Sequence, residues 1–131
     1  MPECKVIRSN ELETEICSGA MTRLAGVSQG LVGSTGIHLA IATIPPGCAS
    51  SPHSHVNCES AIYVVKGKGR FIIGEHLDNE ISIGPGDFVY VPQDAVHQPV
   101  NDGDEPMELI VARNTPVEIV EEYHPEEATT S

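Results

Sequence analysis

The stretch GCASSPHSHVNCESAIYVVKG, residues 47–67, decides how this sequence is interpreted, because two closely spaced histidines precede a carboxylate and a β-branched run. If His53 and His55 lie on a strand, both imidazoles point to the same face and can converge on one point. Imidazole suits Zn, Fe, Ni, Cu and Mn-type ions, and the carboxylate of Glu59 would add charge compensation. The alternative is that the two histidines lie in a loop and bind nothing, so a further ligand is needed to decide.

The stretch GDFVYVPQDAVHQPVN, residues 86–101, provides that ligand. It begins with a short strand-like run, passes through a turn that contains Pro92 and Asp94, and then presents His97. A third histidine from a distant strand would close a metal site from the other side. The two stretches together therefore favour a metal site.

In this order and spacing, the two stretches resemble the paired motifs of the cupin superfamily, in its small single-domain form. The first motif is glycine, five residues, His-x-His, three or four residues, glutamate, six residues, glycine. The second is glycine, five residues, Pro-x-Gly, two residues, histidine, three residues, asparagine. The resemblance covers roughly residues 36–113. It implies a divalent transition metal (Fe, Mn, Zn or Ni) held by His53, His55, Glu59 and His97.

The sequence departs from these motifs at two positions. Seven residues, not six, separate Glu59 from Gly67. Counting back from Gly67 therefore puts Ser60 in the ligand position, whereas counting forward from His55 puts Glu59 there. A slip of one residue reverses the face to which a strand residue points, so Glu59 can bind only if a bulge restores the register. We predict Glu59, with three histidines and water as the alternative. Asp94 replaces the motif glycine, and aspartate tolerates the left-handed backbone of such a turn.

Short β-branched or aromatic runs recur along the chain, with Gly, Pro, Asn and Asp between them. This spacing is typical of an all-β sandwich or small barrel. The resemblance implies a double-stranded β-helix, the jelly roll of two packed antiparallel sheets. We expect a single domain over residues 1–131, with its core at about 36–113 and a mobile acidic tail at about 121–131. The expected strands are Ile37–Ile44, Ala61–Val65, Arg70–Ile73, Glu80–Ile83, Asp87–Val91, Met107–Arg113 and Val117–Val120.

The charge balance excludes some partners. Nineteen acidic residues against seven lysines and arginines give a net charge of -12, which would repel phosphate backbones and anionic lipids. We therefore expect neither nucleic acid nor a membrane as partner. No apolar run is long enough to span a bilayer, and the N-terminus MPECKVIRSNELE lacks the apolar region of a signal peptide. A cytoplasmic protein is expected.

Two tyrosines are candidate catalytic residues. Tyr63 and Tyr90 lie in strand-like runs beside the motifs, where each could line the pocket and donate a proton; packing is the alternative role. Gln98 could accept the second N–H of a ligating imidazole. Few basic residues lie near the motifs, which argues against highly anionic substrates.

Cupins include dioxygenases, decarboxylases, isomerases, lyases and polyketide cyclases, as well as non-catalytic sensors, and the fold does not choose among them. We expect a small metal-dependent enzyme of the oxygenase, isomerase or lyase type that acts on a small organic molecule. The alternative is a non-catalytic small-molecule or metal-sensing binding module. The resemblance also implies a homodimer, in which the segment Cys4–Arg8 could cross to the partner's sheet and cover an exposed edge.

Overall fold

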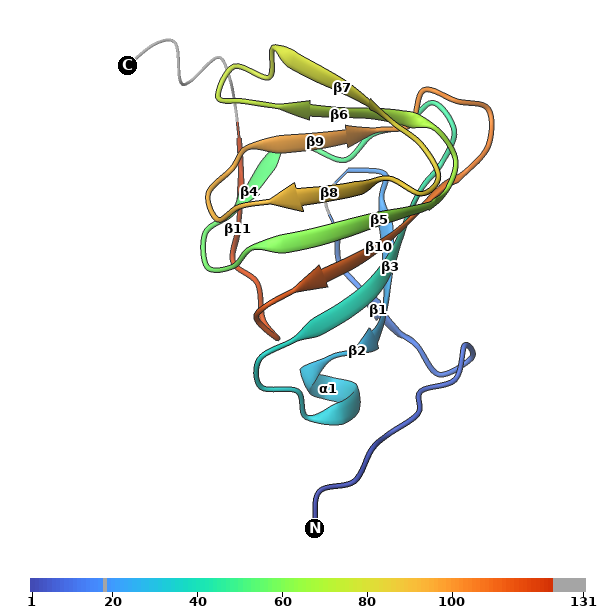
Figure 1. Ribbon diagram of the computed structural model, residues 1–131, viewed down its shortest axis with the longest axis vertical. Helices are drawn as coiled ribbons and strands as arrows, with labels where there is room; N and C mark the ends of the chain where they lie inside the picture. Colours follow the sequence, from blue (N-terminus) through green and yellow to red (C-terminus); the bar gives the residue numbers. More distant parts are fainter. Residues whose placement is uncertain (18, 124–131) are drawn as a thin grey trace.

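The computed structural model describes residues 1–17 and 19–123, and these residues form two antiparallel sheets (Figure 1). The six-stranded sheet has the order β1 (Glu13–Glu15), β2 (Thr22–Val27), β3 (His38–Ile44), β10 (Met107–Arg113), β5 (Ser60–Lys66), β8 (Phe88–Val91). The five-stranded sheet has the order β11 (Val120–Glu122), β4 (His53–His55), β9 (His97–Val100), β6 (Gly69–Ile73), β7 (Asn79–Ile83).

From β3 onward, the chain changes sheet at every connection except the β6–β7 hairpin. This alternation winds the two sheets together as a jelly roll, so the predicted fold is confirmed. One short helix, α1 (Gln29–Val32), lies between β2 and β3. The hydroxyl of Ser28 caps it by accepting a hydrogen bond from the Leu31 N–H.

The core lies between the sheets, and the period of two along each strand creates it. In β5, Ser60, Ile62 and Val64 point inward, whereas Ala61 and Tyr63 point outward. The same alternation in the other strands gives a buried cluster of Ala42, Ile44, Ile62, Val64, Phe71, Ile83, Val91, Met107 and Leu109.

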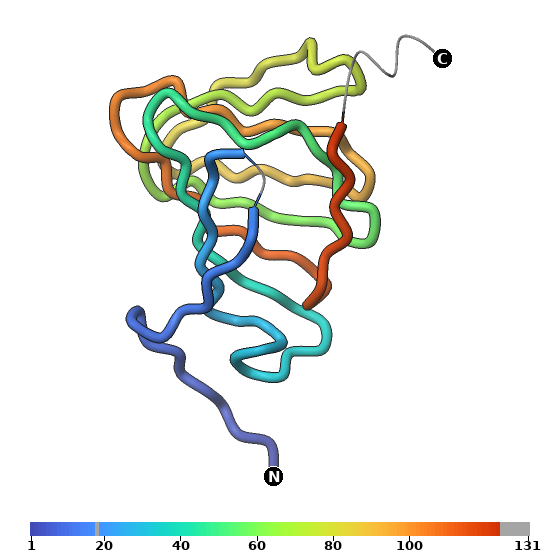
Figure 2. Tube along the Cα trace, turned by 180° about the vertical axis from the view of Figure 1, so that it is seen from behind, coloured from blue at the N-terminus to red at the C-terminus, as the bar shows by residue number. Residues whose placement is uncertain are grey.

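Both ends of the chain differ from the expectation. β1 and β2 precede every predicted strand, and they add two members to one edge of the six-stranded sheet. The last strand is Val120–Glu122 rather than Val117–Val120, and it pairs with β4. The acidic tail expected from about residue 121 thus begins inside a strand, and residues 124–131 of it lie outside the described residues. In the view from behind, β1 and β2 (blue) and β11 (red) lie on the near side of the molecule (Figure 2). Within residues 1–17 and 19–123, no helix has the length and apolarity needed to cross a membrane.

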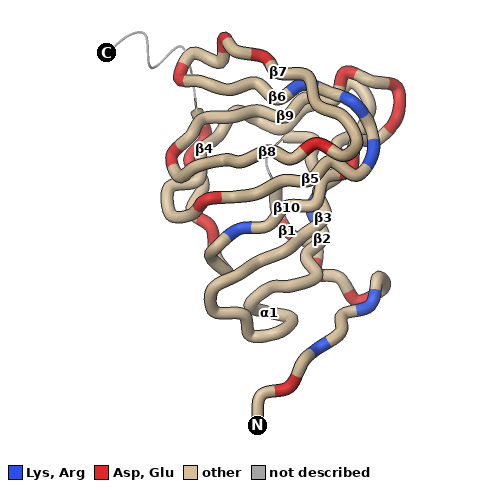
Figure 3. Tube along the Cα trace, viewed as in Figure 1, with Lys and Arg blue, Asp and Glu red and all other residues tan. Residues whose placement is uncertain are grey.

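The outer face of the six-stranded sheet carries a row of apolar side chains. Cross-strand register places Leu24, Ile41, Ile110, Tyr63 and Phe88 side by side across five strands. The rings of Tyr63 and Phe88 are 4.8 Å apart, and Phe88 is 80% exposed. Lysine, arginine, aspartate and glutamate are sparse along these strands in Figure 3. In a chain of net charge -12, a face with few charged side chains reduces the repulsion between two copies.

We propose that this row forms the interface of the expected homodimer, because exposed contiguous apolar surface favours association. The substitution Phe88→Asp is expected to give a monomer by light scattering after size exclusion, since it would place a charge at the most exposed apolar side chain of the row. Glu108→Gln, on the same sheet but outside the row, should leave the mass unchanged. A wild-type protein that is monomeric at high concentration would contradict the proposal.

Candidate metal centre

Three buried histidines meet between the sheets. β4 provides His53 and His55, and β9 provides His97, which is paired with His53 across the two strands. One ring nitrogen from each lies within 4.8 Å of the others. The ring centroids are 4.4 to 5.3 Å apart. Because residues two apart on a strand share a face, the sequence His-Ser-His places two imidazoles on the side from which His97 approaches.

Backbone carbonyls fix the orientation of two of these rings. Nδ1 of His53 lies 2.7 Å from the carbonyl oxygen of Ser51, and Nδ1 of His97 lies 2.9 Å from that of Ala95. A carbonyl can only accept, so each Nδ1 carries the proton and donates it. The other nitrogen, Nε2, then keeps its lone pair for a metal.

Burial keeps two of these imidazoles neutral. Burial is the main cause and the nearby His53 a smaller one, and together they lower the pKa of His97 to about 3. Burial also lowers the pKa of His53, against the opposing effect of its hydrogen bond to Ser51. Neutral imidazole is the form that binds a metal, so these rings stand ready as ligands at neutral pH.

Acidification is expected to destabilise the metal-free protein through His97. The unfolded chain takes up this proton near pH 6.5, whereas the folded protein takes it up only near pH 3. The stabilising contribution is therefore complete above pH 6.5 and is lost as the pH falls toward 3, at about 1.4 kcal/mol per pH unit. Urea unfolding with a chelator should show that the free energy of unfolding falls by about 1.4 kcal/mol more in wild type than in His97→Gln, between about pH 7.5 and about pH 5.5. Equal losses in the two proteins would contradict this.

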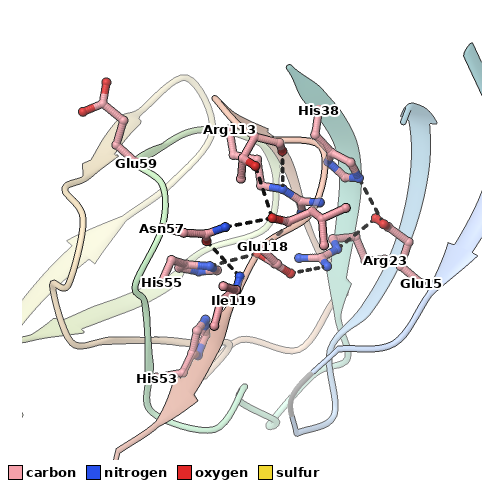
Figure 4. A network of polar contacts seen from close by, with 12 residues as sticks. Glu15, Arg23, His38, His53, His55, Asn57, Glu59, Arg113, Glu118 and Ile119 are labelled. Carbon is pink, nitrogen blue, oxygen red and sulfur yellow. Dashed lines mark hydrogen bonds and ion pairs between the residues drawn. The ribbon is translucent and has the colours of Figure 1, made fainter. Parts of the chain in front are cut away.

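The third ring contacts a carboxylate instead of a carbonyl. Nδ1 of His55 lies 2.9 Å from Oε2 of Glu118, a distance typical of a hydrogen bond although the angles are not. Glu118 also pairs with Arg23 and with Arg113, whose Nη1 is 3.4 Å from Oε2 (Figure 4). Burial raises the pKa of Glu118, but the contacts with His55 and Arg23 outweigh it and hold that pKa well below its usual range. The carboxylate is therefore ionised.

The structure does not bring Glu59 to the histidines, which corrects the expected placement. Glu59 is exposed just before β5, and its carboxylate accepts a hydrogen bond of 2.8 Å from the Tyr90 hydroxyl. Figure 4 shows it pointing away from His53 and His55.

The register explains this placement. Ser60, the first residue of β5, is buried and pairs in step with Val91 on β8 and Arg113 on β10. The bulge between β5 and β10 lies at the other end, between Glu108 and Leu109, so nothing at this end turns Glu59 inward. Counting back from Gly67 thus gives the residue that faces the histidines.

The two tyrosines lie on the outer face of the six-stranded sheet. Tyr63 packs against Phe88, and Tyr90 donates its hydroxyl to Glu59. Neither lines the cavity that contains the three histidines. The amide of Gln98 donates to the Ser50 carbonyl. Tyr63 therefore has a packing role, whereas Tyr90 lines a separate cavity of about 520 Å³ together with His97, with its hydroxyl bound to Glu59.

The turn before β9 behaves as the motif requires. Asp94 adopts a φ of 68°, the left-handed conformation that the motif glycine would take. Its backbone N–H donates to the carbonyl of His55 at 2.9 Å. The turn that leads to His97 is thereby joined to the strand that carries the other two ligand candidates.

Two adjoining cavities lie beside the histidines. The inner one, of about 40 Å³, is lined by Met21, Arg23, Ala42, His53, His55, Ser60, Ile62, Val91, His97, Pro99, Leu109 and Val111. The outer one, of about 270 Å³, which we call the mouth, is lined by Ile16, Cys17, Met21, Arg23, His53, His55, Glu118, Val120 and Glu122. Four residues line both, so the two cavities share a wall that carries two of the three histidines.

Sequence reasoning missed Arg23 and Glu118. Both lie outside the two motifs, and Glu118 falls in the predicted strand Val117–Val120, to which we assigned no functional role. The alternation Arg23-Leu24-Ala25 was the available signal for β2, with Leu24 outside and the other two inside.

Comparison with known proteins agrees with this geometry. The family model described as "Cupin domain" matches residues 40–113. An uncharacterized protein of Methanocaldococcus jannaschii is 30% identical over 79 residues, which is 60% of this chain and 60% of that protein. The match thus spans less than two thirds of that relative.

Two solved structures show the same fold. The polyketide cyclase RemF from Streptomyces resistomycificus is 19% identical, with a TM-score of 0.78 over 98% of this chain and 94% of its own. A Bacillus subtilis oxalate decarboxylase, whose Mn(II) centres were studied, is 23% identical, with a TM-score of 0.69 over 82% of this chain and 29% of its own. With its family match, its two wound sheets and three histidines at the motif positions, this chain belongs to the cupin superfamily.

Proposed function

We propose that this protein is a small metal-dependent enzyme in which His53, His55 and His97 hold a divalent transition metal. The observation that carries the proposal is the convergence of three buried imidazoles beside a cavity. Nδ1 of His53 and of His97 is bound to a backbone carbonyl, and Nδ1 of His55 lies beside the Glu118 carboxylate. Three protein ligands leave coordination positions open. When bound, such an ion would polarise a carbonyl or make a water ligand acidic. The reaction type that fits is an oxygenase, isomerase or lyase.

The size of the cavity supports a small organic molecule as the substrate. The inner cavity, of about 40 Å³, accommodates little more than a water molecule or the tip of a ligand. The body of the substrate would therefore lie in the mouth, with its reactive end toward the histidines. The hydroxyl of Ser60, which faces this cavity, could donate to that end or accept from it.

The charges around the mouth favour a neutral or weakly charged substrate. Arg23 lines both cavities, but its guanidinium is paired with Glu15 and Glu118. Glu122 adds a further carboxylate at the rim. An anionic substrate would have to displace one of these carboxylates from Arg23.

One observation favours the second candidate, a non-catalytic small-molecule or metal-sensing module. Among the described residues that line the inner cavity, none carries a carboxylate or a phenol that could act as general acid or base. The candidates expected for that role, Tyr63 and Tyr90, lie outside it.

Elemental analysis of untagged protein, purified without chelator, tests the proposal first. A near-stoichiometric metal is expected. Iron would direct the search to oxygenase assays, and zinc, nickel or manganese to isomerase and lyase panels. Absence of metal after reconstitution with each ion would overturn the proposal, whereas a metal-loaded protein without turnover would favour the binding module.

A further inference from the structure

Glu118 lies in the segment between β10 and β11, and this segment is held from both sides. The side-chain amide of Asn57 donates to the carbonyl of Val117 at 2.9 Å and accepts from the N–H of Ile119 at 2.8 Å. These two groups flank Glu118 directly. The amide therefore imitates a neighbouring strand, and it fixes the backbone from which the Glu118 side chain extends (Figure 4).

Arg113 fixes the start of the same segment. Its guanidinium donates to the carbonyls of Thr115 and Pro116, each at 2.9 Å. The backbone N–H of Val56 donates to the Ile119 carbonyl, also at 2.9 Å. Side chains and backbone thus anchor the loop on both sides of Glu118.

The Glu118 carboxylate is largely buried, with 13% of its side chain exposed, and it touches three groups. Arg23 and Arg113 offset its charge, and the third group is Nδ1 of His55. Among the three clustered histidines, only His55 meets a charged acceptor at Nδ1. A carboxylate at this nitrogen orients the ring and makes Nε2 a more basic ligand than a carbonyl does.

We propose that Glu118 is a positioning residue of the metal centre. It orients the His55 ring so that Nε2 points toward the cavity. Its negative charge acts on the metal through the His55 imidazole, in place of the carboxylate expected from Glu59. This inference rests on the proposed metal site. Asn57 acts one step further out, by holding Glu118 in place.

The test uses Co²⁺ as the probe, with Glu118→Gln and, as matched control, Glu121→Gln on the exposed strand β11. Affinity is measured by competition with a chromophoric chelator. Glu118→Gln is expected to weaken Co²⁺ binding on the order of 10- to 100-fold, and Glu121→Gln to leave it unchanged. Equal affinity of a folded Glu118→Gln protein and wild type would overturn the inference.

Proton NMR of the Co²⁺ protein distinguishes a positioning role of Glu118 from a purely structural one, because a structural role would leave the imidazole N–H resonances unchanged. Each ligating imidazole with a protonated Nδ1 gives one paramagnetically shifted exchangeable resonance. We expect three in wild type and in Glu121→Gln, with one of them shifted or lost in Glu118→Gln. An unchanged set of three in Glu118→Gln would overturn the inference.

Removal of the Glu118 charge leaves Arg23 and Arg113 without their shared partner, which destabilises a buried site. Asn57→Ala is therefore the second variant, because it keeps every charge and only releases the segment. It is expected to weaken Co²⁺ binding several-fold and to speed solvent exchange of the same single resonance. Wild-type affinity and exchange in Asn57→Ala, with an intact circular dichroism spectrum, would overturn the inference. If wild type itself does not bind Co²⁺ or any other ion tested, the proposed function fails as well.

Discussion

The substitution His97→Ala is expected to abolish metal binding, with a loss of affinity of more than about 100-fold. It removes the only ligand candidate that comes from β9 and leaves two nitrogens from one strand, His53 and His55. Two imidazoles on one side of an ion cannot close a site that needs at least three protein ligands. Elemental analysis and chelator competition on the purified variant measure the effect.

The matched control is His76→Ala, since His76 is an exposed imidazole between β6 and β7. It should retain the metal content of wild type. The metal-free His97→Ala protein should still show the circular dichroism of a β-sheet protein, so that loss of metal is not mistaken for loss of fold. A folded His97→Ala protein with a full equivalent of metal would refute the ligand set.

The second large effect is expected on stability, from Gly69→Ala. A Cβ at Gly69 would lie 2.1 Å from the backbone oxygen of Val100 and 3.1 Å from the sulfur of Met107. Backbone cannot rotate away as a side chain can, so β6 must move away from β9. We expect a loss of about 3 kcal/mol or more in the free energy of unfolding, measured by urea denaturation.

Gly36→Ala is the control for Gly69→Ala, because a Cβ there would meet nothing within 4 Å. Its effect should stay within about 0.5 kcal/mol of wild type. Gly36 lies in an exposed bend, so its variant measures the exchange of glycine for alanine without a close backbone neighbour. Equal stability of the two variants would show that β6 and β9 can separate at little cost.

The core of the fold could be predicted from the sequence because its signals are local. The turns around the motifs contain Gly, Pro and Asp at positions where backbone conformation demands them, as the left-handed Asp94 shows. β11 carries no such signal, since all three of its residues are exposed and two are acidic. It is a strand only because the edge of β4 is there to pair with it.

The candidate metal site divides in the same way. Residue spacing and the motif resemblance pointed to His53, His55 and His97, the three histidines that the structure brings together. The choice between Glu59 and Ser60 depended on the pairing of β5 with two strands that are distant in sequence, Val91 on β8 and Arg113 on β10. Glu118 could not be found by spacing at all, because its contact with His55 spans 63 positions and depends on a loop held by side chains.

Because β4 pairs mainly with β11, the candidate metal site is expected to form late during synthesis of the chain. β4 carries two of the three histidines, yet it shares one residue pair with β9 and three with β11. Residues 120–122 leave the ribosome long after residues 53–55. Until then, β4 carries His53 and His55 but lacks its main pairing partner, β11. Metal binding is therefore expected only after β11 has left the ribosome. Ribosome-arrested chains with and without residues 107–122 exposed would show this by their uptake of Co²⁺.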